Sequence, residues 1–200
     1  MQIYVATNNR HKVRELEELF PAIHLSTPAE AGIAFNHEEV EETFLGNSLG
    51  KARALYARVK SPVLADDSGL CVDALDGAPG VRSARYGSPD DGRTALSAEE
   101  KNALLLREMY GRPDRRCRFV CVMTLVVSEH RFFSIQETCE GLLLDAPRGA
   151  EGFGYDPIFL LPEEGLSMAE LTPERKNQLS HRGRAAARMR SVLASLAAVP

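Results

Sequence analysis

The fold class is indicated first by residues 3–9, IYVATNN, where a short apolar run ends in a polar turn. An apolar run of this kind is typical of a buried β-strand. After the turn, apolar residues recur at the spacing of one helix face, at Val13, Leu16, Leu19 and Phe20. A strand, a polar turn and a helix in this order would present the N–H groups of the helix N-terminus to an anion.

The rest of the chain alternates between predicted helices and strands. Helices are predicted from about Thr43, from the capping box at residues 97–100 through Tyr110, after Thr172-Pro173, and over residues 181–198. A strand is predicted at residues 62–65, and it ends where Asp66 begins the polar sequence DDSG. Two more strands, at residues 118–127 and 132–144, are predicted to form a hairpin, and a last strand is predicted at residues 157–161. Alternation with one antiparallel hairpin predicts an α/β fold, a mixed β-sheet flanked by helices.

Composition and charge narrow the class of protein. The length of 200 residues suits one domain, residues 1–200, with no linker. The 24 Lys and Arg against 28 Asp and Glu give a net charge of −4, so we expect no binding to nucleic acid or to a membrane. The N-terminus lacks a signal-peptide pattern, and no apolar run has membrane length, which predicts a cytoplasmic protein. The four cysteines lack zinc-ligand spacing and are expected to be small core residues.

Two segments in the N-terminal third have residues suited to phosphate and metal chemistry. The turn from Thr7 to Lys12 has a hydroxyl, two amides and a cation at a helix start, but taken alone the pattern is weak, and the alternative is a polar helix cap with a solvated lysine. There is no P-loop pattern. Asp66 and Asp67 follow an apolar strand and should point to opposite sides of it, so that one could hold Mg²⁺ or accept a proton from water. The alternative for this pair is an Asx-turn that leads to Gly69.

Two further groups of residues are candidates for the same kind of site. The acidic run at residues 38–42 could be a solvated loop and helix start, but its carboxylates would repel one another unless a cation lay among them, so one of them is a candidate metal ligand. Lys51 follows on the next predicted helix, where a lysine normally faces solvent. In the C-terminal quarter, residues 152–157, GFGYDP, precede Lys176 and the sequence SHRG at residues 180–183. An aromatic ring, a carboxylate, a lysine and a His-Arg pair are the side chains needed to stack a flat base, read its polar edge and hold an anionic tail.

Taken in order, seven segments make the chain resemble the inosine triphosphate pyrophosphatase family, whose members are also described as XTP/dITP diphosphatases. They are VATNN with Lys12, TF at residues 43–44 with Asn47 and Lys51, ADDSGL at 65–70, GAPGV at 77–81, SARY at 83–86, GFGYDP at 152–157 and SHRG at 180–183. The resemblance implies an elongated α/β fold of two lobes with the active site in a central cleft, Mg²⁺ as cofactor, and a homodimer. It also implies hydrolysis of ITP, dITP or XTP between the α and β phosphates, giving a monophosphate and pyrophosphate, in cleansing of the nucleotide pool.

The resemblance also implies roles for single residues. Asp67 matches the catalytic proton acceptor and magnesium ligand. Glu39, twelve residues before Lys51, matches a second metal-associated acid, with Glu38 still open. The residues that match substrate contacts are Thr7, Asn8, Asn9, Arg10, His11, Lys12, Lys51, Ser68, Phe153, Gly154, Tyr155, Asp156, Lys176, His181 and Arg182.

One position departs from the pattern of this family. Where bacterial members commonly have Thr-Phe-x-Glu-Asn, the chain has Gly46 in place of the glutamate. Glycine costs about 1 kcal/mol relative to alanine inside a helix, so the start of this helix and the register of the acidic run stay open.

Two other functions also stay open: a nucleotide sensor without catalysis, and a phosphatase that releases orthophosphate from the γ position.

Overall fold

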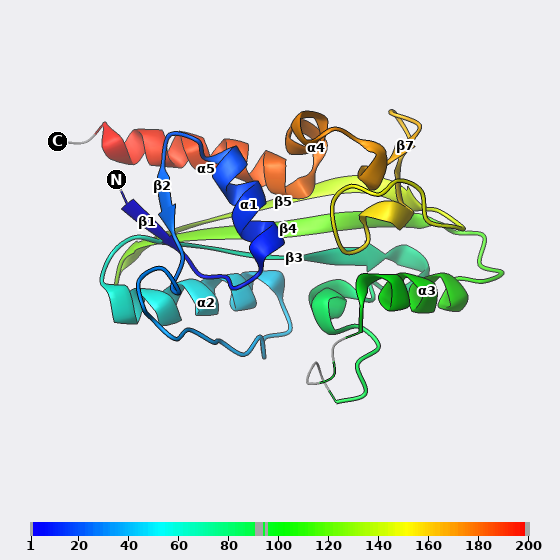
Figure 1. The fold of residues 1–200 in the computed structure, drawn as a ribbon, viewed down its shortest axis with the longest axis horizontal. Helices are drawn as coiled ribbons and strands as arrows, with labels where there is room; N and C mark the ends of the chain where they lie inside the picture. Colours follow the sequence, from blue (N-terminus) through cyan, green and yellow to red (C-terminus); the bar gives the residue numbers. More distant parts are fainter. Residues whose placement is uncertain (1, 91–93, 95, 199–200) are drawn as a thin grey trace. The chain divides into compact units, whose positions relative to one another are not determined.

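A computed structural model describes residues 2–90, 94 and 96–198 (Figure 1). Its α-helices are α1 (Arg10–Leu19), α2 (Phe44–Val59), α3 (Ala98–Glu108), α4 (Pro173–Leu179) and α5 (His181–Ala197). Its strands are β1 (Gln2–Val5), β2 (His24–Ser26), β3 (Val63–Val72), β4 (Arg116–Ser128), β5 (Arg131–Leu143), β6 (Phe159–Leu161) and β7 (Leu166–Ser167). Short 3-10 helices lie at Asp73–Leu75, Gly80–Arg85, Asp156–Ile158 and Met168–Glu170.

The strands form one mixed sheet in the order β2-β1-β3-β4-β5-β6-β7. β1 pairs in parallel with β2 and β3, whereas β6 is antiparallel to β5 and β7. β4 and β5 are neighbours joined by only two residues, which confirms the predicted hairpin. The α/β fold with a mixed sheet is therefore confirmed. Among the described residues, no helix combines the length and the apolar character that a membrane crossing requires.

Contacts divide the chain into two compact units. Unit 1 consists of Met1–Asp67, Cys121–Glu137 and His181–Pro200, and unit 2 consists of Ser68–Val120 and Thr138–Ser180. Strands β3, β4 and β5 contribute residues to both units, so neither unit is a continuous piece of chain.

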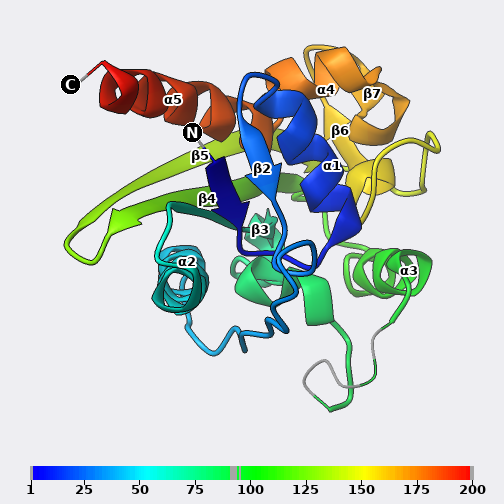
Figure 2. The ribbon, with the colours of Figure 1, turned by 60° about the vertical axis from the view of Figure 1, so that its left-hand side comes forward.

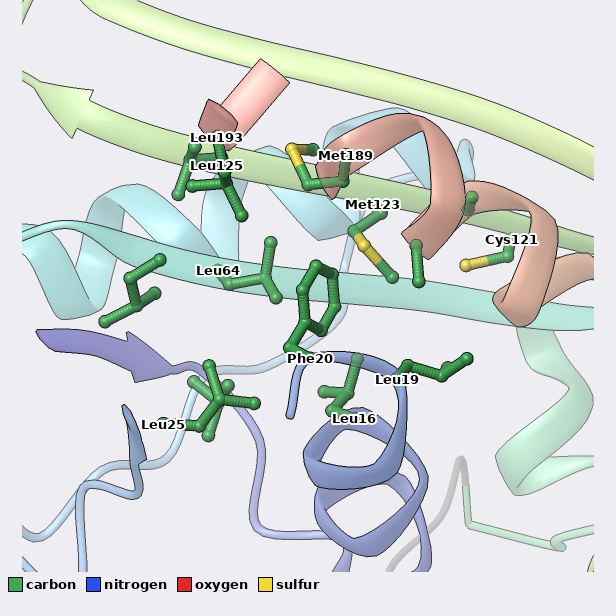
Figure 3. Packing of buried hydrophobic residues seen from close by; sticks show 14 residues of the cluster. Leu16, Leu19, Phe20, Leu25, Leu64, Cys121, Met123, Leu125, Met189 and Leu193 are labelled. Carbon is green, nitrogen blue, oxygen red and sulfur yellow. The ribbon is translucent and has the colours of Figure 1, made fainter. Parts of the chain in front are cut away.

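Unit 1 is a three-layer arrangement that follows from strand alternation. Side chains on one face of the sheet pack with α1 and α5, as Figure 3 shows for Leu64 of β3 beside Phe20 and Met189. The neighbouring Val63 and Ala65 pack instead with Ala52 and Leu55 of α2. Helices α1 and α5 therefore cover one face of β1 and β3, and α2 covers the other (Figure 2).

Unit 2 has a core of its own. Leu70 and Val72 of β3 pack with Leu105 of α3, with Phe119 of β4 and with Phe159 of β6. The capping box of α3 is present as predicted, with the Ser97 hydroxyl accepting from the backbone N–H of Glu100. This helix ends at Glu108, two residues before the predicted end at Tyr110.

Two strand predictions are wrong in extent. The strand predicted to end at Asp66 continues to Val72, so the pair of acids lies inside β3 and the Asx-turn alternative is wrong as well. The strand predicted at residues 157–161 begins only at Phe159, because Asp156–Ile158 forms a turn of 3-10 helix that includes Pro157. Other predictions are confirmed: Thr43 caps α2, Thr172 caps α4, and α5 begins at His181.

Candidate active site

Asp67 lies on the face of β3 that is covered by α2, and there it meets two other charged residues. Lys51 of α2 lies with its Nζ 2.5 Å from Glu39 Oε1 and 3.5 Å from Asp67 Oδ1. The same Nζ donates to the backbone carbonyl of Asp66 at 2.8 Å. Lys51 is only 7% exposed, so the expectation that a lysine at this position faces solvent is wrong.

The two carboxyl groups of this cluster differ in their affinity for a proton. Burial is the largest single influence and would raise the pKa of Glu39, but the charge and hydrogen bond of Lys51 together with the charge of Lys12 outweigh it, and the pKa is lowered. Burial raises the pKa of Asp67, and this outweighs the opposing charge of Lys51, with Glu39 adding to the rise. Carboxylates whose pKa values are moved apart in this way are suited to different tasks, one staying ionised and the other exchanging a proton.

Asp67 also has an oxygen available for a ligand. Its Oδ2 is buried and has no hydrogen-bond partner among the described residues, which is uncommon for a buried polar atom. No three His, Cys, Asp or Glu side chains gather as a metal site within residues 2–90, 94 and 96–198. Mg²⁺ is commonly held by one or two carboxylates together with phosphate oxygens and water. Glu39 and Asp67 fit that kind of site, because each offers carboxylate oxygens and a magnesium site of this kind needs no third acid.

Asp66 points to the other face of β3 and anchors a second charged cluster. Its carboxylate lies 3.2 Å from Lys12 Nζ and accepts from Arg182 Nε at 3.1 Å and Nη2 at 3.0 Å. Arg182 Nη1 donates to Glu15 at 2.6 Å. Burial would raise the pKa of Asp66, but Lys12 and Arg182 outweigh it and the pKa is far below its ordinary value.

The two clusters lie within electrostatic reach of one another. Burial is the largest influence on the pKa of both Glu39 and Asp67 and acts to raise it, and the charge of Lys12 opposes that rise at both residues. The sheet brings Lys12 close to these acids. Val5, the last residue of β1, is in register with Leu64, just before Asp66 and Asp67, and the turn that leads to Lys12 follows β1. The two acids lie inside β3 but beside the carboxyl end of β1, and open α/β sheets bind ligands at the carboxyl ends of their parallel strands.

The turn after β1 is held by its own side chains. Asn9 caps α1, its Oδ1 accepting from the N–H groups of His11 and Lys12. Thr7 Oγ1 accepts from the Asn9 N–H at 3.1 Å. Asn8 donates to the carbonyl of Phe35 at 2.7 Å, which ties the turn to the segment before the acidic run. Arg10 and His11 are exposed in the first turn of α1.

In unit 2, the structure brings together three of the predicted base-binding residues. Asp156 Oδ2 accepts from the backbone N–H of Phe153 and from Lys176 Nζ, both at 2.8 Å. The same Nζ lies 5.1 Å from the centroid of the Phe153 ring. Gly152, with φ +78°, makes this arrangement possible, because a Cβ there would lie 2.2 Å from Asp156 Oδ2.

Two contacts that the sequence did not reveal support this segment. The Gly154 carbonyl accepts from Asn102 Nδ2 of α3 at 3.1 Å, and the buried Tyr155 donates its hydroxyl proton to the Ser83 carbonyl at 3.0 Å. These partners are 52 and 72 residues apart in sequence, and no local pattern links them. Ser68 begins unit 2 on β3, whereas the buried His181 belongs to unit 1 with Arg182.

Comparison with protein families gives one match over almost the whole chain. The sequence profile described as the Ham1 family matches residues 3–192. A dITP/XTP pyrophosphatase of Treponema denticola is 52% identical over 185 residues, which cover 92% of this chain and 94% of the relative. A dITP/XTP pyrophosphatase of Geobacillus kaustophilus is 44% identical over 188 residues, covering 92% of this chain and 90% of that protein.

Solved structures give the same match at the level of the fold. A HAM1 protein from Coxiella burnetii superposes with a TM-score of 0.87 at 35% identity, covering 98% of this chain and 99% of that one. A nucleoside-triphosphatase, dITP/XTP pyrophosphatase, from Mycobacterium abscessus superposes with a TM-score of 0.73 at 37% identity, covering 94% and 98%.

Proposed function

We infer the function from one premise: this chain belongs to the Ham1 family. It is a nucleoside-triphosphate pyrophosphatase that hydrolyses ITP, dITP and XTP between the α and β phosphates, giving the monophosphate and pyrophosphate. The observation that carries this proposal is the cluster of Glu39, Lys51 and Asp67, in which two carboxylates of opposite pKa shift share one buried ammonium.

Charge neutralisation is the first requirement of the reaction. A nucleoside triphosphate carries close to four negative charges, which would repel an attacking water. We assign Lys12 and Lys51 to the phosphates, because each brings a cation to the carboxyl end of β1. Thr7, Asn8, Asn9, Arg10, His11 and Ser68 are proposed as further substrate contacts. Mg²⁺, held by Glu39 and Asp67, would supply the remaining positive charge against the phosphate oxygens.

Asp67 is the proposed proton acceptor. Its Oδ1 faces Lys51, whereas its Oδ2 has no partner among the described residues. Water adds across the α–β anhydride bond, and Asp67 takes the proton that the water loses. The raised pKa of Asp67 suits this task, and the lowered pKa of Glu39 suits a residue that stays an anion throughout.

Base recognition is assigned to the segment from Phe153 to Asp156, with Lys176, His181 and Arg182. Phe153 would stack on any purine without discriminating between them, contributing ~1–3 kcal/mol. A donor from His181 or Arg182 would pair with a 6-oxo group. Adenine presents a donor at that position, so a buried donor would stay unpaired, at a cost of ~1–3 kcal/mol, which is about 5- to 150-fold in rate.

We further propose a cytoplasmic homodimer whose role is cleansing of the nucleotide pool. The four free cysteines support a reducing compartment, and the dimer and the cleansing role are proposed from the family resemblance. Separation by size at several protein concentrations tests the dimer, and a monomer at every concentration would contradict it.

Product identity tests the reaction itself. We expect the protein, incubated with Mg²⁺ and with ITP, XTP, GTP or ATP separately, to release monophosphate and pyrophosphate. ITP and XTP should be far better substrates than GTP and ATP. Release of orthophosphate would identify a phosphatase acting on the γ position, and binding without product would identify a nucleotide sensor. Either result would overturn the proposed function.

Replacement of Phe153 tests the stacking assignment. Phe153→Ala should raise KM by ~5- to ~150-fold for every purine substrate alike, since stacking is worth ~1–3 kcal/mol and does not distinguish bases. The variant keeps the backbone N–H that donates to Asp156, so the segment should keep its conformation. Phe132→Ala, at a ring that is 42% exposed on β5, is the control and should leave KM unchanged. A loss confined to ITP would contradict simple stacking.

A further inference from the structure

The segment that carries Glu39 is not a helix or a strand, so its conformation depends on what it rests upon. Residues 33–41 have no regular structure and lie between β2 and α2. One residue of α2, Asn47, binds this segment twice. Its Oδ1 accepts from the Glu41 backbone N–H at 3.0 Å, and its Nδ2 donates to the Glu41 carbonyl at 3.2 Å. The side chain of Asn47 thus satisfies both backbone groups of a residue two positions from Glu39.

Gly46, next to Asn47 in the helix, provides the space for this contact. A Cβ at Gly46 would lie 2.8 Å from Glu41 Cβ and 3.0 Å from Glu41 Cγ. The atom in the way is the Cβ of Glu41 and not the tip of a flexible side chain, so a larger residue would have to move the Glu41 backbone. A side chain at this position is therefore incompatible with the acidic segment as it lies here.

We propose that Gly46 and Asn47 are positioning residues that fix Glu39 beside Lys51 and Asp67. They act through Glu41. Asn47 holds the Glu41 backbone by two hydrogen bonds, and the missing side chain of Gly46 lets Glu41 lie close to the helix. This inference rests on the proposed function, in which Glu39 and Asp67 hold the metal. Asn47 is fully buried and Lys51 lies four residues further along α2, so both project from the same face of the helix.

The consequence for the metal follows from the distances. Glu39 Oε1 contacts Lys51 Nζ at 2.5 Å, so a shift of the segment would separate Glu39 from the ammonium group that it shares with Asp67. Residues that orient a metal ligand commonly change metal affinity or activity by about 10- to 100-fold when they are replaced. We expect changes of that size for Gly46 and Asn47, without loss of the fold.

The experiment compares two alanine substitutions in the same helix. Gly46→Ala would place its Cβ against the Cβ of Glu41, whereas Gly50→Ala would meet only the imidazole tip of His37, at 3.0 Å, a side-chain end that can turn away without moving the backbone of the segment. Both replace glycine by a better helix former, so neither should lower the melting temperature through helix propensity. Mn²⁺ alone is the probe, and its binding is followed by electron paramagnetic resonance, with Glu39→Gln marking the expected site.

We expect Gly46→Ala and Asn47→Ala to weaken Mn²⁺ binding by about 10-fold or more, as Glu39→Gln does, and Gly50→Ala to bind like the wild type. The Mg²⁺ concentration for half-maximal hydrolysis of ITP should rise in parallel. Wild-type Mn²⁺ affinity in Gly46→Ala and Asn47→Ala, or no Mn²⁺ binding by the wild type, would overturn the inference. Release of pyrophosphate from ITP by the wild type, measured alongside, shows whether the proposed function itself stands.

Discussion

Asp67→Asn is expected to lower kcat for ITP by about 10²- to 10⁴-fold, the usual contribution of a positioned proton acceptor. Asparagine keeps the shape of the side chain but has no negative charge and cannot take a proton from water. Lys51 keeps its contacts with Glu39 and with the Asp66 carbonyl, so the cluster should stay folded. Circular dichroism before and after substitution checks that point.

Nucleotide binding separates a chemical role of Asp67 from a binding role. Affinity for the α,β-methylene analogue of ITP, which cannot be cleaved between those phosphates, should be nearly the same in wild type and Asp67→Asn. The phosphate contacts are assigned to Lys12 and Lys51, which the substitution leaves in place. Undiminished turnover would remove Asp67 from the mechanism, and an equal loss of binding and turnover would assign it to binding alone.

Asp66→Asn is expected to have the largest effect on stability. Asp66 is buried and pairs with both Lys12 and Arg182, and removal of one partner from a buried ion pair costs about 3–5 kcal/mol. The free energy of unfolding in urea at pH 7 should fall by that amount. Asp114→Asn, which breaks the pair between Asp114 and the exposed Arg116, is the control and should have little effect.

The pH dependence of the same variant identifies the cause. Because the pKa of Asp66 is lowered in the folded protein, its contribution is present above the unfolded pKa of about 3.9 and is lost as the pH falls below it. The difference in stability between wild type and Asp66→Asn should therefore be constant from pH 7 to about pH 5 and shrink in stronger acid. A difference that stayed constant down to pH 3 would mean that packing, and not charge, is responsible.

Local signals in the sequence were enough for most of the fold. The N-caps Asn9, Thr43, Ser97 and Thr172 and the apolar spacing after each of them depend only on nearby residues, so the helices were predictable. The alternation of side chains along β3 was also predictable, and Asp66 and Asp67 do point to different helices. The end of β3 was not predictable from the sequence. A strand can continue through polar residues when neighbouring strands pair with it and when the charged side chains of those residues have ion-pair partners.

The sequence by itself determined the α/β class and the family, and it supplied the candidate residues for the chemistry, because a residue type and its near neighbours establish these. Only the tertiary structure decided which charges meet. Lys12 and Arg182 meet Asp66 across 54 and 116 residues, and Asn47 supports the segment of Glu39 through the Glu41 backbone. Such pairings depend on which faces of the sheet α1, α2 and α5 cover, and no local pattern contains that information.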